Sequence, residues 1–328
     1  MLEDKILNVI DLKKYYLIRK GFFDKTNGYV KAVDGISFSI NKGGTLGLVG
    51  ESGCGKTTTG MLILKLIDKT DGKILFKGEN IFDLKGDGLR AFRKKMQVIF
   101  QDPYNSLNPR VRIGSMFAEI LKFYKIASRK ELKDRTKKVL ESVGISQYDT
   151  EKYPFEFSGG QRQRIAIARA ISLEPEFIVA DEPVSALDVS IQAQIINLIK
   201  DLKEKFNLTF LFVSHNLSVI RQISDNVAVM YLGRLVEVAN CDELFKHPAH
   251  PYTEALLSVI PNINQEKIFN KIYLKGNLPD PINMPSGCHF HPRCKYIMNV
   301  CRENTPQLKK ISDNHMVSCH LNNGYGIS

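Results

Sequence analysis

Residues 50–57 read Gly50-Glu51-Ser52-Gly53-Cys54-Gly55-Lys56-Thr57, and this stretch decides the fold. It is a complete G-x-x-x-x-G-K-[ST] pattern: glycines let backbone N–H groups approach phosphates, the lysine contacts the β- and γ-phosphates, and the threonine hydroxyl binds Mg²⁺. The preceding apolar segment, residues 45–49, predicts a buried strand, and a helix should begin near Lys56 and carry Leu62, Leu64 and Leu66. A strand, a phosphate loop and a helix in this order predict a nucleotide site.

A second glycine motif lies about a hundred residues further on, Phe157-Ser158-Gly159-Gly160-Gln161. It precedes a helix-like run that holds Ile165, Ala168 and Ile171. Ser158 is a good N-cap, and a helix N-terminus behind small residues is a natural site for an anion. One chain therefore offers two separate ways of holding a triphosphate, which predicts an ATP sandwiched between two such chains.

Polar residues follow three further apolar stretches. Asp181 and Glu182 end residues 177–182, where the aspartate could reach the Mg²⁺ shell and the glutamate could orient or deprotonate the attacking water. His215 follows residues 210–214, and Gln101 follows residues 98–100. Parallel strands carry ligands at their carboxyl edge, so His215 is expected near the γ-phosphate and Gln101 in the shell of Mg²⁺ and water.

The order of elements predicts an α/β fold with several parts. Residues 1–45 alternate apolar and polar positions, which predicts antiparallel strands joined by a polar loop from Lys20 to Lys31. Residues 103–158 read as an inserted helical subdomain, and from Phe177 a strand–helix–strand pattern predicts a mostly parallel sheet that ends in a hairpin around Gly233. Proline and cysteine crowd the chain beyond Pro261, so we expect an ATPase domain over residues 1–260 and a small irregular extension over residues 261–328.

Composition narrows the class of protein. The 328 residues carry a formal charge of +11, but the basic clusters are short and lack interleaved aromatic residues, which favours a solvated surface, with a nearby anionic membrane as a modest addition, over nucleic-acid binding. No apolar run of about 18 residues occurs, and the N-terminus lacks the order of a secretory signal. A cytosolic protein is expected.

In combination, these motifs resemble the nucleotide-binding subunit of an ATP-binding-cassette (ABC) transporter over roughly residues 5–260, with a P-loop NTPase (RecA-like) core. In that resemblance residues 50–57 look like the Walker A motif, Gln101 the Q-loop, residues 157–161 the signature, residues 177–182 the Walker B motif, Ser185-Ala186-Leu187-Asp188 the D-loop and His215 the switch histidine. One departure is Phe157, where leucine is commoner.

The resemblance implies a set of ATP-site residues. Glu182 and His215 would be catalytic, while Thr57 and Gln101 would hold Mg²⁺. The family also stacks an aromatic residue on adenine, for which Tyr16 fits best and Tyr15 is the alternative. The nucleotide would be bound by Tyr16, Gly50, Glu51, Ser52, Gly53, Cys54, Gly55, Lys56, Thr57, Thr58, Gln101 and Asp181, and by Ser158, Gly160 and Gln161 of the facing chain.

Residues 97–109, the run His250-Pro251-Tyr252-Thr253 and the tail resemble the oligopeptide/dipeptide importer ATPases, closest to the F-type member of the D/F pair. The implied partners are two membrane permease subunits, a second ATPase subunit and, indirectly, an external solute-binding protein, with the chain peripheral on the cytoplasmic face of the cell membrane. The second ATPase would be a related D-type chain, with a second copy of this chain as the alternative. A nickel-importer ATPase of the same family and a non-transport ABC ATPase are the alternatives.

Four cysteines of the tail, Cys288, Cys294, Cys301 and Cys319, form a candidate metal site. Four thiolates suit either Zn²⁺ or an iron–sulfur cluster, and the absence of a C-x-x-C pair weakens the zinc-ribbon reading. Similar tails in the importer family hold a [4Fe–4S] cluster, which the resemblance therefore implies here, with Zn²⁺ second and unliganded thiols third. Four histidines nearby keep other ligation open: His289, His291, His315 and His320.

Overall fold

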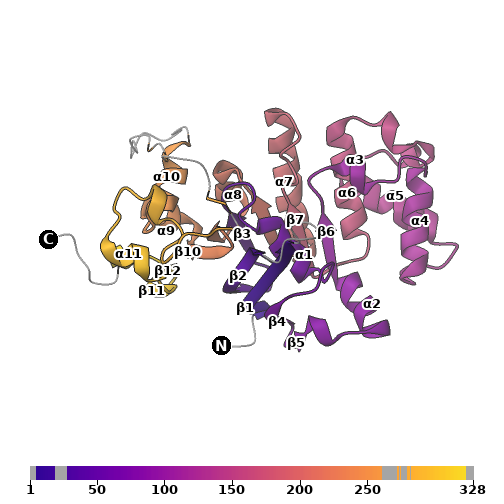
Figure 1. Cartoon of the computed structure of the whole chain (residues 1–328). Coiled ribbons are helices and arrows are strands. Elements are labelled where there is room, and N and C mark those ends of the chain that lie inside the picture. Colours follow the sequence, from indigo (N-terminus) through magenta and orange to yellow (C-terminus); the bar gives the residue numbers. More distant parts are fainter. Residues whose placement is uncertain are drawn as a thin grey trace. The chain divides into compact units, whose positions relative to one another are not determined.

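The computed structural model describes residues 5–18, 28–260, 272, 274, 279–280 and 282–322. Most of the polar loop expected from Lys20 to Lys31 lies outside the described residues. The chain divides into two compact units: unit 1 comprises residues 1–40, 45–82 and 214–328, and unit 2 comprises residues 41–44 and 83–213. Figure 1 labels their elements.

Unit 1 contains an antiparallel sheet with the strand order β2-β1-β4-β5. Its strands are β1 (Lys5–Ile18), β2 (Gly28–Asn41), β4 (Asp71–Phe76) and β5 (Glu79–Asn80). Alternation places Leu7 and Val9 in the core, where β1 pairs with β4 and Leu7 lies opposite Phe76. The predicted antiparallel strands are therefore present, and β1 and β4 lie side by side in Figure 1.

Unit 1 also holds five strands in the order β11-β12-β10-β9-β3. They are β3 (Thr45–Val49), β9 (Asn226–Tyr231), β10 (Arg234–Asn240), β11 (Lys309–Ser312) and β12 (His315–Val317). β3 is buried throughout and runs parallel to β9, and β9 forms the expected hairpin with β10. The extension adds β12 antiparallel to β10, so part of this tail is regular sheet.

The helices of unit 1 are short. They are α1 (Lys56–Ile63), α8 (Leu217–Ile223), α9 (Cys241–Lys246), α10 (Pro251–Ser258) and α11 (Asn299–Glu303), with the single turns η4 (His291–Arg293) and η5 (His320–Asn322). The expectation that Leu64 and Leu66 continue the first helix is wrong. The helix ends at Ile63, and Leu64 is its C-cap. Lys65 then adopts a left-handed backbone with φ +50°, and the Leu66 N–H donates a hydrogen bond to the Met61 carbonyl at 2.9 Å, which terminates the helix.

Unit 2 contains three parallel strands, β6 (Met96–Ile99), β7 (Phe177–Asp181) and β8 (Thr209–Ser214). Outside the helical region of residues 103–158, its helices are α2 (Gly86–Lys95), α6 (Gly159–Ile171) and α7 (Val189–Phe206). The first four residues of β7 and all of β8 are buried. Since the strands are parallel, their carboxyl ends share one edge, as the strand–helix–strand pattern predicts.

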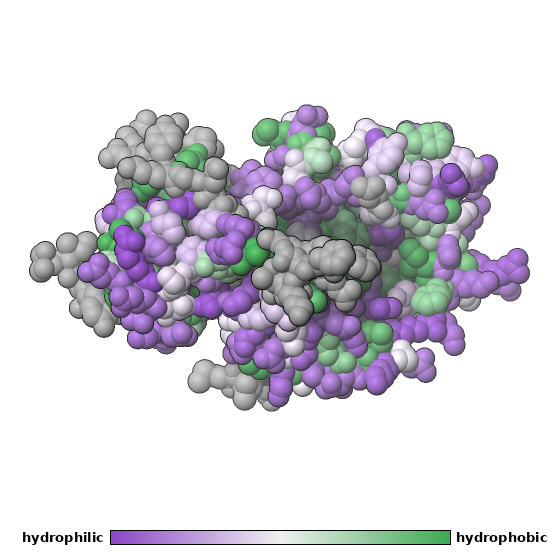
Figure 2. Space-filling view, viewed as in Figure 1, coloured by the Kyte–Doolittle hydropathy of each residue, from purple (hydrophilic) through white to green (hydrophobic). Residues whose placement is uncertain are grey.

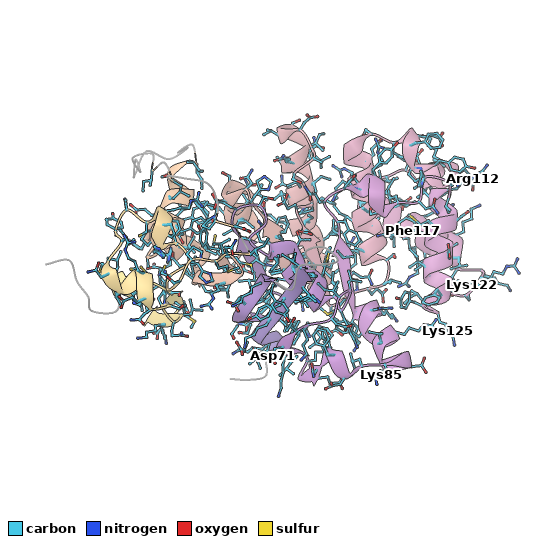
Figure 3. The ribbon with its side chains drawn as sticks, in the orientation of Figure 1. Asp71, Lys85, Arg112, Phe117, Lys122 and Lys125 are labelled. Carbon is cyan, nitrogen blue, oxygen red and sulfur yellow. The ribbon has the colours of Figure 1, made fainter. Side chains whose placement is uncertain are left out.

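The region expected to be a helical insertion is helical. It comprises α3 (Pro103–Ser106), α4 (Ile113–Phe123), α5 (Leu132–Ser142) and the turns η2 (Gln147–Glu151) and η3 (Pro154–Glu156). Phe117 of α4 is fully buried, whereas Arg112 and Lys122 point away from the helices in Figure 3. Hydrophilic side chains predominate on the face drawn in Figure 2. Among the residues placed in the structure, no helix is long and apolar enough to span a bilayer.

Candidate functional site

The phosphate loop of unit 1 has a shape that only glycine permits at two positions. Gly50 adopts φ +154° and Gly55 φ +109°. A Cβ on Gly50 would lie 2.2 Å from the Met230 carbonyl oxygen, and one on Gly55 would lie 2.1 Å from that of Ala32. The loop is thus pressed against β9 and β2, and larger residues would displace it.

Lys56 closes the loop from its C-terminal end. Its side chain is buried, and Nζ donates hydrogen bonds to the carbonyls of Gly50 at 2.8 Å and Glu51 at 2.9 Å. Thr57 beside it is exposed at the first turn of α1. The side chain of Cys54, within the loop, is buried, and desolvation raises the pKa of its thiol. The arrangement places a cation and the N-terminus of a helix around one loop, as phosphate binding requires.

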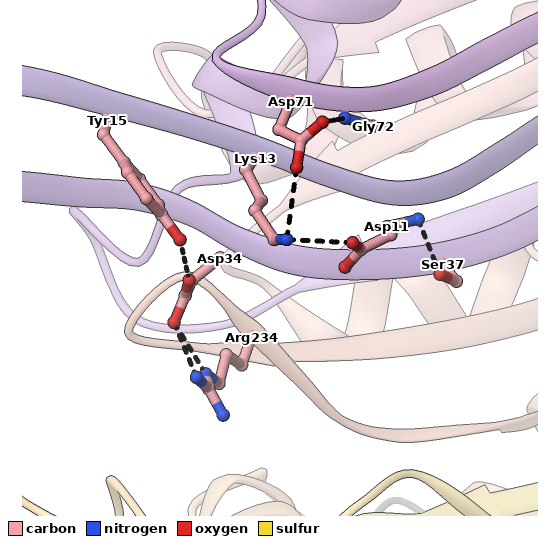
Figure 4. Close-up of polar contacts among 8 residues, drawn as sticks. All are labelled: Asp11, Lys13, Tyr15, Asp34, Ser37, Asp71, Gly72 and Arg234. Atoms are coloured by element: carbon pink, nitrogen blue, oxygen red, sulfur yellow. Dashed lines mark hydrogen bonds and ion pairs between the residues drawn. The ribbon is translucent and has the colours of Figure 1, made fainter.

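The two candidate adenine-stacking tyrosines have different environments, and Figure 4 shows that of Tyr15. The Tyr15 hydroxyl donates to the Asp34 carboxylate, which also accepts from Arg234, Nε at 2.9 Å and Nη2 at 2.7 Å. Burial and the Asp34 hydrogen bond raise the pKa of Tyr15 to about 12. Tyr16 is 41% exposed on β1. Tyr15 is therefore engaged in a structural network, while the Tyr16 ring is accessible.

The signature segment of unit 2 forms the N-terminus of α6, as its sequence predicts. Ser158 and Gln161 form a capping box: the Gln161 N–H donates to Ser158 Oγ at 3.3 Å, and Gln161 Oε1 accepts from the Ser158 N–H at 2.9 Å. A Cβ on Gly160 would lie 2.7 Å from Ile191 Cγ2, so close packing on α7 requires glycine there. Phe157 is buried, so this departure from leucine keeps an apolar side chain in the core.

Three predicted residues of unit 2 stand at one edge of its parallel strands. Asp181 ends β7, Glu182 follows it, and Gln101 lies two residues after β6. Glu182 adopts φ +48°, and its N–H donates to the Val213 carbonyl at 2.9 Å. A non-glycine residue in the left-handed region is uncommon and clusters at functional sites. His215 follows β8 by one residue and belongs to unit 1.

The four tail cysteines gather in unit 1. The Cys288 N–H donates to the Cys301 carbonyl at 2.9 Å, and Cys301 and Cys319 are buried. Burial raises the pKa of Cys319 to about 12, and the thiols of Cys288, Cys294 and Cys301 contribute to the rise. Across the described ranges, no group of three or more His, Cys, Asp or Glu is arranged to hold a metal ion.

Three of the tail histidines have protein partners instead. His315 Nε2 lies 2.7 Å from Glu237 Oε1, His320 Nε2 lies 2.9 Å from the Asn304 carbonyl, and His291 Nδ1 lies 3.0 Å from the Cys288 carbonyl. Nδ1 of His289 is buried without a hydrogen-bond partner among the described residues. Three of the four histidines are thus engaged through one ring nitrogen each, and His289 is not.

Sequence reasoning missed the residues that join the tail to the phosphate loop. Arg293 forms an ion pair with Glu51, and the Tyr252 hydroxyl accepts from the Glu51 N–H at 2.9 Å. Phe290 packs against Tyr231 and Tyr252. In the sequence, Arg293 is noticeable because it precedes Cys294. No local pattern could connect it with Glu51, which is 242 positions away.

Comparisons with known proteins agree with this architecture. Residues 33–185 match the family model "ABC transporter", and residues 236–301 match "Oligopeptide/dipeptide transporter, C-terminal region". The oligopeptide transport ATP-binding protein AppF of Bacillus subtilis is 51% identical over 97% of this chain and 98% of its own. The dipeptide transport ATP-binding protein DppF of Haemophilus influenzae is 47% identical over 96% of both chains.

Solved structures confirm the predicted fold class. The structure of cbiO1 from Clostridium perfringens, described as part of the ABC transporter complex cbiONQ, covers 75% of this chain and 92% of its own at 27% identity and a TM-score of 0.63. A dimeric structure of the ATP-binding cassette MJ0796 bound to ADP and Pi covers 72% of this chain and 98% of its own at 26% identity and a TM-score of 0.62.

Proposed function

Since this chain belongs to the ATPases of ABC transporters, in the oligopeptide/dipeptide branch, we propose that it powers the import of dipeptides or oligopeptides across the cytoplasmic membrane. The assignment of a peptide substrate rests on the C-terminal region. The family model that matches there is that of peptide transporters, and relatives match along nearly the whole chain. The F-type subclass is part of this proposal and agrees with the names of both relatives.

ATP binding in this proposal uses residues of two chains. Lys56 and the loop N–H groups take the β- and γ-phosphates, Thr57, Gln101 and Asp181 hold Mg²⁺, and the accessible Tyr16 ring stacks on adenine. The exposed N-terminus of α6, with Ser158, Gly160 and Gln161, takes the nucleotide of a facing ATPase, which we assign to a related D-type chain. The dimeric, nucleotide-bound state of the MJ0796 cassette supports such a sandwich.

Hydrolysis is assigned to Glu182 as the base that activates water, and to His215 as the residue that contacts the γ-phosphate. The left-handed backbone of Glu182 supports the first role, because such a conformation is retained only where the surroundings enforce it. The chain's own residues bind the triphosphate, orient the water and accept its proton, while Mg²⁺ supplies charge neutralisation when bound.

Coupling to two membrane permease subunits is proposed to run through the helical region after Gln101. Arg162 of α6 lies over the Tyr104 ring at 4.6 Å, so the segment after Gln101 contacts the signature helix directly. Apolar side chains of this region are exposed, with Tyr148 at 83% and Phe123 at 57%, which suits a docking surface. Basic side chains such as Lys122 (Figure 3) support a peripheral position on the anionic cytoplasmic face of the membrane.

We also propose that the tail cysteines hold a [4Fe–4S] cluster, with Zn²⁺ as the alternative. The donor set fits: Cys288, Cys294, Cys301 and Cys319 are soft ligands whose thiols interact electrostatically. Within the described residues no group of three or more such side chains is arranged to hold a metal ion, so the proposal rests on the four thiols and on the family resemblance. Anaerobically purified protein should contain about four irons and equivalent acid-labile sulfide per chain; zinc without sulfide would establish the alternative.

The division of the chain into a cassette over residues 1–260 and an extension over residues 261–328 remains our proposal, as does a helical subdomain at about residues 103–158. The helical subdomain is supported by helices α3 to α5, which all fall within residues 103–158.

Reconstitution tests the transport function. The chain would be co-purified with its permeases and D-type partner, placed in vesicles with the solute-binding protein, and supplied with ATP and a labelled dipeptide. ATP-dependent peptide uptake that is lost in Lys56→Ala supports the proposal. Uptake of Ni²⁺ but not of peptides would overturn the substrate assignment and leave the ATPase assignment intact.

A further inference from the structure

An ion pair joins the C-terminal extension to the phosphate loop. The Arg293 guanidinium donates two hydrogen bonds to the Glu51 carboxylate, Nη1 to Oε2 at 2.6 Å and Nη2 to Oε1 at 3.0 Å. The Arg293 side chain is only 7% exposed and that of Glu51 30% exposed. Bidentate pairs of this kind are strong and geometrically specific, whereas most exposed ion pairs contribute little.

Glu51 is itself part of the loop that faces the phosphates. Its carbonyl accepts from Lys56 Nζ at 2.9 Å, and its N–H donates to the Tyr252 hydroxyl at 2.9 Å. Its carboxylate is a negative charge in a loop that binds a polyanion. Unless that charge is neutralised and held aside, it repels the triphosphate, because like charges a few ångströms apart interact strongly at the protein surface.

The segment that carries Arg293 is fixed on both sides of the arginine. Phe290 is fully buried, with its ring centroid 5.3 Å from that of Tyr231 and 5.4 Å from that of Tyr252. After the arginine, the Cys294 N–H donates to the His291 carbonyl at 3.2 Å, and before it the Cys288 N–H donates to the Cys301 carbonyl at 2.9 Å. The position of the guanidinium is therefore set by the fold of the extension and not by the cassette alone.

We propose that Arg293 is a positioning residue of the ATP site. It neutralises the Glu51 carboxylate and holds it away from the bound triphosphate, so that the extension contributes directly to nucleotide affinity. This inference rests on the proposed ATP site at Lys56. It assigns the extension a part in the ATPase reaction in addition to any part it has in holding a metal or cluster.

Equilibrium binding of a non-hydrolysable ATP analogue with Mg²⁺ to the full chain tests the inference without depending on turnover. Arg293→Gln should raise the Kd roughly tenfold, equivalent to about 1.4 kcal/mol, while leaving the melting temperature within a few degrees. Adding Glu51→Gln to this variant should recover at least about threefold of the lost affinity, because no unneutralised carboxylate remains beside the phosphates. Arg293→Lys should lie between wild type and Arg293→Gln, since it keeps the charge but loses the bidentate geometry.

Lys295→Gln is the matched control. It removes the same charge two residues away, where Lys295 forms an exposed ion pair with Glu254 at 3.2 Å, and its Kd should stay within about twofold of wild type. The inference is overturned if a folded Arg293→Gln chain binds like wild type, or if the double variant binds as weakly as Arg293→Gln, which is the result of a purely structural pair. If wild type binds no analogue, or if Lys56→Ala binds it equally well, the ATP site itself is wrong.

Discussion

Replacing Phe290 with alanine tests how the extension is held in place. The ring is 2% exposed and lies between 5.3 and 5.6 Å from the rings of Tyr231, Tyr252 and His250. Truncating a buried phenylalanine lowers the free energy of unfolding by about 3–5 kcal/mol, and this figure includes the contribution of its edge-to-face aromatic contacts. Because Phe290 and these three rings all belong to unit 1, we expect the cost to appear as local opening of the extension and not as unfolding of the whole chain.

Native-state hydrogen exchange measures this opening directly. The Cys288 N–H is bonded to the Cys301 carbonyl at 2.9 Å, and its exchange reports whether the segment is closed. A loss of about 3–4 kcal/mol should speed exchange roughly 100- to 1000-fold, since each 1.4 kcal/mol is a factor of ten. Amides of β7 in unit 2 should be unaffected. Tyr296→Ala, which truncates an aromatic residue that is 37% exposed in the same region, serves as the control and should change exchange less than about tenfold. Unchanged protection of the Cys288 amide in Phe290→Ala, or an equal loss of protection in β7, would refute the idea that Phe290 holds the extension in place.

Three further predictions concern the site and its surroundings. Glu182→Gln should still bind ATP but lose roughly 10²- to 10⁴-fold in turnover, because the base is removed; wild-type hydrolysis rates would contradict the assignment. Tyr16→Ala should weaken ATP binding by about tenfold through lost stacking, whereas Tyr15→Phe, which loses the bond to Asp34, should lower the melting temperature and leave ATP affinity as it is; the reverse pattern would make Tyr15 the stacking residue. Burial lowers the pKa of His250 from 6.5 to about 4, and Glu237 raises it by a smaller amount. The folded state therefore favours neutral His250: its contribution to the free energy of unfolding is complete above pH 6.5 and is lost as the pH falls from there towards 4. Between pH 8 and pH 5 the loss of stability should be about 2 kcal/mol, seen as lower protection factors in α10 once the intrinsic pH dependence of amide exchange is divided out, and a His250→Gln variant that kept the same pH dependence would count against this origin.

The local parts of the site could be predicted from the sequence because each is encoded within a few residues. The strand before Gly50 and the helix after Gly55 are consecutive, and Ser158 and Gln161 cap a helix within one turn. The carboxyl-edge position of Asp181 follows from the parallel pattern alone. In each case the hydrogen bonds join near neighbours, so the residue types and their spacing suffice.

The remaining features depend on pairs that are distant in the sequence. The choice between Tyr15 and Tyr16 depends on Asp34 and Arg234, which approach from β2 and β10. The Arg293–Glu51 pair joins a phosphate loop to a tail that composition alone describes as irregular. Long-range partners of this kind are set by the packing of whole strands, which periodicity does not specify.

The strand β12 limits where this chain can be cut. The peptide-transporter family model ends at residue 301, yet Glu237 of β10 pairs with Val317 and accepts a hydrogen bond from His315. A chain shortened after residue 301 would turn β10 into an edge strand and would leave the fully buried Glu237 carboxylate without that partner. Such a fragment is expected to pair through its open edge with other copies and aggregate, so a soluble, isolated cassette must retain the last strand of its own tail.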